Sequence, residues 1–101
     1  MAWDSSVPTL TEWVAVLRVA DSADELDGEA TTLIERVPEQ GLFGRVDAHE
    51  GLAERLGVRP GTWVSGVVAG TRQGMETALA AVIGRREPLV VGEFRVRWLS
   101  L

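Results

Sequence analysis

The chain has 101 residues, the usual size of one domain with one hydrophobic core. Hydrophobic residues make up 46% of it and charged residues 25%, which is typical of globular proteins and unlike disordered chains or membrane spans. The net charge of −5 argues against a general nucleic-acid binder, because phosphate contacts need a basic surface. The absence of Cys and the presence of one His exclude disulfides, a Cys nucleophile and the common thiolate or multi-histidine metal sites. We therefore expect no metal and no cofactor.

Residues 1–8 carry one acid and no basic residue, so they lack the pattern of a secretory signal. We expect a flexible N-terminal tail, a cytoplasmic protein and no membrane association. All ten basic residues are Arg, and residue types with AT-rich codons (Lys, Asn and Tyr) are absent, which indicates a high-GC, bacterial genome. Charge is uneven along the chain: residues 1–54 hold twelve acids and three Arg, and residues 55–101 hold three acids and seven Arg.

The first half predicts a strand, a helix and a second strand. Residues 12–20 are rich in Val and place Trp13 and Leu17 on one parity, which favours a strand, with a helix as the alternative. A helix follows from an N-cap at Asp21 or Ser22 to Pro38. Its expected apolar face is Leu26, Ala30, Leu33, Ile34 and Val37. A short strand is expected over 42–46.

The second half repeats this order after a short helix. Asp47 and Glu50 have the spacing of a capping box, which predicts a helix over 47–57 that ends at Gly57. A Val-rich strand over 62–69 contains Gly66, which indicates a bulge or a close backbone contact. Thr71 can cap the next helix, and a last strand is expected over 89–99. The apolar face of the second long helix is Met75, Ala78, Leu79, Val82 and Ile83.

The two halves show a weak internal repeat with an offset of 49 to 51 residues, visible in the pairs Trp13/Trp63 and Pro38/Pro88. We therefore predict an α+β fold of one domain over 9–101, with halves 11–46 and 62–99 joined by a helix over 47–57. This is a ferredoxin-like βαβ(α)βαβ sheet with both long helices on one face. An unrelated alternating α/β order is the alternative.

Strand parity predicts what each sheet face carries. The set Trp13, Ala15, Leu17 and Val19 is expected to face the helices, together with Phe94, Val96 and Trp98. The opposite, open face would show Val14, Val16, Val64 and Val68. Arg18, Arg95 and Arg97 would lie together on that face as a binding site for a small anion. Alternatively, the face packs against a second copy in a homodimer, or it is solvated.

The sequence contains two further candidate sites. Trp13, Trp63, Phe94 and Trp98 could line a pocket between sheet and helices, which would suit a cofactor-free enzyme of the dimeric α+β barrel type acting on a small apolar or aromatic substrate. His49, beside Glu50 at the start of a short helix, is a weak candidate for a general base. The favoured hypothesis is a non-catalytic binding or regulatory module that self-associates through its sheet face and binds a protein or a small anionic partner.

Overall fold

The computed structural model describes residues 10–83 and 87–97, so the expected tail over 1–8 and Trp98 lie outside the described residues. The elements in chain order are β1 (Thr11–Ala20), the 3-10 helix η2 (Ala23–Leu26), α1 (Asp27–Arg36), β2 (Gly41–Arg45), the 3-10 helix η3 (Val46–Ala48), α2 (Leu52–Leu56), β3 (Trp63–Ala69), α3 (Arg72–Val82) and β4 (Val90–Arg95). Residues 11–20 form a strand, which decides between the two predictions made for that segment.

The four strands form one antiparallel sheet in the order β2-β3-β1-β4. The first and last strands are neighbours, as predicted, with Glu12 opposite Phe94 and Val16 opposite Val90. The protein therefore has an α+β fold with a four-stranded open sheet, and this arrangement is compatible with a ferredoxin-like fold.

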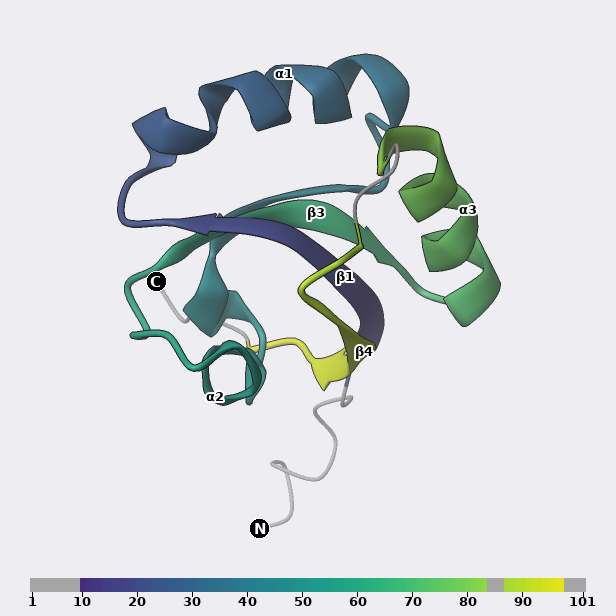
Figure 1. The fold of residues 1–101 in the computed structure, drawn as a ribbon. Coiled ribbons are helices and arrows are strands. Elements are labelled where there is room, and N and C mark those ends of the chain that lie inside the picture. The colour runs from purple at the N-terminus through teal and green to yellow at the C-terminus, as the bar shows by residue number, and fades with distance from the viewer. Residues whose placement is uncertain (1–9, 84–86, 98–101) are drawn as a thin grey trace, which may run out of the picture.

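The long helices α1 and α3 pack on the same face of the sheet, while α2 lies on the other side (Figure 1). We call the buried residues between these two helices and the sheet the α1/α3 core. Its members are Ala15, Leu33, Val37, Val67, Met75 and Ala78. Ile34 does not belong to this core, because its side chain is 70% exposed, which corrects the apolar face predicted for α1.

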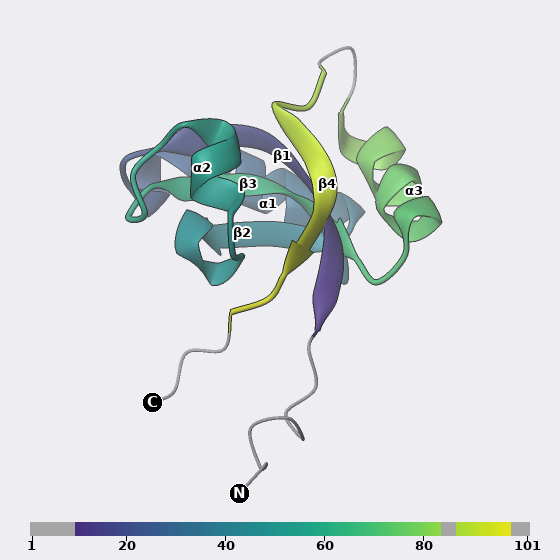
Figure 2. The same ribbon diagram turned by 90° about the horizontal axis from the view of Figure 1, so that it is seen from below.

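The other sheet face is covered by residues 46–58, which we call the covering segment (Figure 2). Its contact with the sheet is the α2 core, formed by Val14, Val16, Val46, Leu52, Val64, Val90 and Phe94. Val14 and Val16 of β1 are fully buried, and Val64 of β3 is 1% exposed. The expectation of an open Val-rich face was therefore wrong, because the chain covers that face itself. Phe94 lies on this side, opposite Glu12, and not on the α1/α3 side where it was predicted.

A bulge in β1 changes which side chains face the helices. The pairing with β3 shifts register between Val16, which is opposite Gly66, and Arg18, which is opposite Ser65. A Cβ atom on Gly66 would lie 2.0 Å from the carbonyl oxygen of Ala15, so this position admits only glycine without a backbone shift. The bulge or close contact predicted at Gly66 is confirmed. Beyond it, Val19 packs with the α2 core, so the predicted alternation fails at this point.

Local side-chain chemistry explains the starts of η2 and α3, but not the start predicted at Asp47. The Ser22 backbone N–H donates to the Glu25 carboxylate over 3.2 Å at the start of η2, and Thr71 Oγ1 accepts from the Gly74 N–H over 3.0 Å at the start of α3. The exception is the predicted helix over 47–57. Residues 46–48 form a 3-10 turn, and α2 begins only after Gly51, whose φ of 83° interrupts the helix.

Candidate functional site

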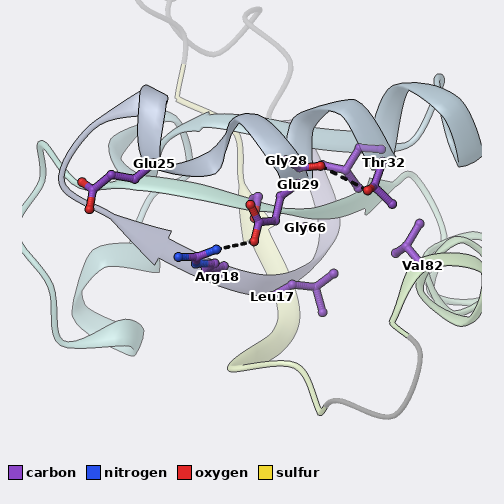
Figure 3. Close-up of a pocket in the computed structure, with 10 residues that line it drawn as sticks. Leu17, Arg18, Glu25, Gly28, Glu29, Thr32, Gly66 and Val82 are labelled. Atoms are coloured by element: carbon purple, nitrogen blue, oxygen red, sulfur yellow. Dashed lines mark hydrogen bonds and ion pairs between the residues drawn. The ribbon is translucent and has the colours of Figure 1, made fainter.

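The pocket we consider as the candidate site lies between α1 and the bulged part of β1 and β3, and its volume is about 440 Å³ (Figure 3). Its lining residues come from five elements, β1, η2, α1, β3 and α3: Leu17, Arg18, Glu25, Gly28, Glu29, Thr32, Leu33, Ser65, Gly66 and Val82. Ligand-binding pockets of proteins commonly fall between about 300 and 1,000 Å³. The pocket is therefore large enough for a small organic molecule.

The pocket has a polar end and an apolar end. Figure 3 shows Arg18 and Glu29 facing each other, Glu25 on the far side of them, and Val82 at the opposite end. The Thr32 hydroxyl donates to the Gly28 carbonyl over 3.1 Å and is thereby occupied within α1. Leu33 is 5% exposed and belongs to the α1/α3 core, so the apolar end continues that core. Such a lining favours a ligand with a polar head and an aliphatic body.

The polar end contains an ion pair between Arg18 and Glu29. The Arg18 side chain is 50% exposed and the Glu29 side chain 20% exposed, so the pair lies at the mouth of the pocket. The bulge explains this pairing, because it turns Arg18 away from the face that its parity predicted and toward α1. Sequence reasoning selected Arg18 but missed both of its acidic neighbours, Glu25 and Glu29.

Ser65 is the most unusual residue of the lining. It is 1% exposed, and its Oγ has no hydrogen-bond partner. An unpaired buried hydroxyl costs on the order of 1–3 kcal/mol, and such groups in native proteins call for an explanation. Ser65 stands opposite Arg18 across β1 and β3, which places it at the polar end of the pocket. One signal in the sequence pointed to it: a Ser and a Gly adjacent within a Val-rich strand.

The three Arg residues proposed as an anion site do not lie together. Arg95 pairs with Thr11 on β1, seven residues from Arg18, which corresponds to about 23 Å along an extended strand. Arg95 Nη1 lies 3.9 Å from Glu50 Oε2, and the backbone N–H of Arg97 donates to the Ala48 carbonyl. Arg18 is paired with Glu29 on α1. The three side chains therefore do not form the predicted cluster, because the antiparallel register of β1 and β4 places Arg95 at the opposite end of β1 from Arg18.

The aromatic residues proposed to line a pocket are also separated. Trp13 is opposite Ala69 at one end of the β1/β3 ladder, and Trp63 is opposite Ala20 at the other end. Trp63 contacts Phe43, with ring centroids 5.6 Å apart, and Phe94 lies on the other face of the sheet. The fourth aromatic residue, Trp98, is outside the described residues. The described part of the chain does not bring these side chains to one pocket.

His49 connects the covering segment to the sheet through its side chain and its backbone. It is 6% exposed, its Nε2 lies 3.0 Å from Glu12 Oε1, and its backbone bridges Val96. The neighbouring Glu50 N–H donates to the Arg95 carbonyl over 2.8 Å. His49 was expected in the first turn of a helix beside the Glu50 carboxylate, but it lies between η3 and α2 with Glu12 as its partner. This arrangement supports a role in stability rather than in catalysis.

A double-mutant cycle measures this contribution. We expect Glu12→Gln and His49→Asn to show a coupling of about 1 kcal/mol in urea denaturation, because the pair is largely shielded from solvent. The matched control is the pair of Arg59 and Asp21, whose side chains are 86% and 83% exposed at 3.7 Å. Exposed pairs of this kind contribute little, so Arg59→Gln and Asp21→Asn should be additive. Equal coupling in both cycles would contradict the assignment.

Comparison of the chain with protein-family models, with curated proteins and with solved structures found no match. Within residues 10–83 and 87–97, no group of three or more acidic or His side chains is placed to hold a metal ion. In the same part of the chain, no helix is long and apolar enough to cross a membrane. The fold thus defines a small α+β protein, and its described residues form a pocket beneath α1.

Proposed function

We propose that this protein is a small non-catalytic binding module and that its ligand is a small molecule held in the pocket beneath α1. The observation that carries the proposal is Ser65, a buried hydroxyl without a partner at the polar end of a pocket of ligand size. A ligand with a polar head would give this hydroxyl its missing hydrogen bond. The same proposal includes the ferredoxin-like assignment of the fold, which is supported by the strand order and by two long helices on one face.

The proposal keeps the binding role inferred from the sequence and changes its location. Self-association through the sheet face is not part of it, because the α2 core buries Val14, Val16 and Val64 within one chain. A small anion is also not the preferred partner, because Arg18 is already paired with Glu29. The enzyme alternative depended on an aromatic pocket whose described members, Trp13, Trp63 and Phe94, lie apart, and it gains no support from their placement.

The Ser65→Ala variant tests this function. Without a ligand, we expect the variant to be more stable than the original chain by about 1 kcal/mol, since it loses an unpaired buried hydroxyl. At the same time, it should bind pocket probes more weakly. Improved stability together with weaker binding is what a binding residue is expected to show. Urea denaturation measures the first effect, and nuclear magnetic resonance titration of labelled protein measures the second.

The probes are three compounds with the same branched body: 3-methylbutan-1-ol, 3-methylbutan-1-amine and 3-methylbutanoate. Resonances of Leu17 and Leu33 report occupancy, because both residues line the pocket. Thr31→Ala is the control, since it removes an exposed hydroxyl that donates to the Asp27 carbonyl and does not line the pocket. If none of the probes moved these resonances, and Ser65→Ala were no more stable than the original chain, the proposed function would be wrong.

A further inference from the structure

The charges around the pocket are predominantly negative, which bears on the kind of ligand it takes. Among the residues that the structure describes, three ionisable side chains line it, Arg18, Glu25 and Glu29, and their formal charges sum to −1. The two helical segments above the pocket, η2 and α1, hold five acids and one Arg between residues 23 and 36. The first 54 residues of the chain carry nine more acids than Arg residues. The field at the mouth of the pocket therefore attracts cations and repels anions.

The two acids of the polar end can accept donors of a positive head group in addition to their described partners. Glu29 is paired with Arg18, and Glu25 accepts from the Ser22 N–H over 3.2 Å and from its hydroxyl over 3.3 Å. A carboxylate has about four lone-pair positions, so both acids can accept additional donors. An anionic head would instead meet the carboxylates of Glu25 and Glu29, and like charges repel each other.

The Ser65 hydroxyl also favours a ligand whose head group donates hydrogen bonds. An ammonium group has three donors and no acceptor, so it can donate to the Ser65 hydroxyl oxygen and to carboxylate oxygens at the same time. Ser65 stands opposite Arg18 across the strands, close to the acids of the polar end. An ammonium group would therefore satisfy both the Ser65 hydroxyl and the carboxylates of the polar end.

The apolar end defines the rest of the ligand. Leu17, Leu33 and Val82 form its wall, and Gly28 and Gly66 contribute no side chains to the space between the helix and the sheet. A Cβ atom on Gly28 would meet no heavy atom within 4 Å, which shows that the pocket is open at that point. A short, branched aliphatic chain would bury its surface here and remove it from water.

From these observations, we infer that the pocket binds a small aliphatic amine in its protonated form. The ammonium group lies near Glu29 and Ser65, the Glu25 carboxylate adds negative charge at the polar end, and the aliphatic body lies at Leu17, Leu33 and Val82. This inference rests on the proposed function, because it names the ligand class of the same pocket. It makes a claim that the proposed function does not: the sign of the charge on the head group decides affinity.

The three matched probes test this claim, because they differ only in head group. We expect 3-methylbutan-1-amine to bind at least about tenfold more tightly than 3-methylbutan-1-ol, and 3-methylbutanoate to bind most weakly. The preference for the amine should shrink as salt is added, because the pair at the mouth of the pocket is partly exposed. Dissociation constants are obtained from the titrations of the Leu17 and Leu33 resonances.

Glu25→Gln provides the matched variant. It should weaken amine binding about threefold to tenfold and leave alcohol binding unchanged, because it removes a charge and keeps the size of the side chain. Glu35→Gln is the control, since Glu35 is an exposed acid of α1 that does not line the pocket. Equal or tighter binding of the alcohol or of 3-methylbutanoate would overturn the amine inference and leave the proposed function standing. Failure of the amine to bind at all would also overturn the inference.

Discussion

Gly66→Ala should destabilise the protein by roughly 3–5 kcal/mol, the largest effect we expect from any single methyl group added to the described residues. The new Cβ would lie 2.0 Å from the Ala15 carbonyl oxygen and 3.0 Å from Val16 Cα. Both are backbone atoms of the central strand β1, so neither can move without disturbing pairing on both of its sides. Urea denaturation followed by circular dichroism measures the loss.

Gly44→Ala is the control for this substitution. Gly44 lies in β2, the strand next to β3, and a Cβ there would meet no heavy atom within 4 Å. An alanine in a strand also loses less conformational freedom on folding than a glycine, so we expect Gly44→Ala to be neutral or slightly stabilising. If the two variants lost equal stability, the close approach at the bulge would not be the reason why Gly66 is glycine.

The bulge also marks the limit of what strand parity could predict. Up to Val16, the alternation in β1 is correct: Trp13 packs against the α1/α3 core, and Val14 belongs to the α2 core. After the register shift, the alternation no longer holds, and Arg18 pairs with Glu29 of α1. Gly66 signalled an irregularity, but a single sequence does not say in which neighbouring strand the extra residue lies.

The position of Phe94 was unpredictable for a related reason. Alternation within β4 divides its residues into two sets, but only the pairing with β1 decides which set faces the helices. That pairing places Phe94 opposite Glu12 and therefore in the α2 core. Helix starts were more predictable, since the Thr71 cap depends on residues within one turn.

The position of the covering segment on the sheet could not be predicted from the sequence. A helix over 47–57 was predicted, but α2 has five residues, too few to be stable alone, and its position is decided by the sheet face it covers. Local patterns do not report such long-range contacts. The Val face was predicted to be open and to meet a second copy, an anion or solvent, but residues of the same chain cover it.

Leu52→Ala tests whether this cover is essential. Leu52 is 0% exposed and is the α2 residue at the centre of the α2 core. Its truncation should cost about 2–5 kcal/mol, as for other Leu to Ala changes in protein interiors. Because a five-residue helix has little stability of its own, we expect the covering segment to detach before the sheet unfolds. Amide hydrogen exchange should therefore accelerate first over residues 46–58.

Leu56→Ala is the matched control, because Leu56 lies in the same helix and is only partly buried against the same core. It should cost less than half as much as Leu52→Ala. Detachment would expose Val14, Val16 and Val64, and such an apolar face tends to associate. Leu52→Ala should therefore bind a hydrophobic dye and form dimers at high concentration, whereas Leu56→Ala should not. If both variants stayed monomeric and lost equal stability, the covering segment would not be what keeps this sheet face from a second copy.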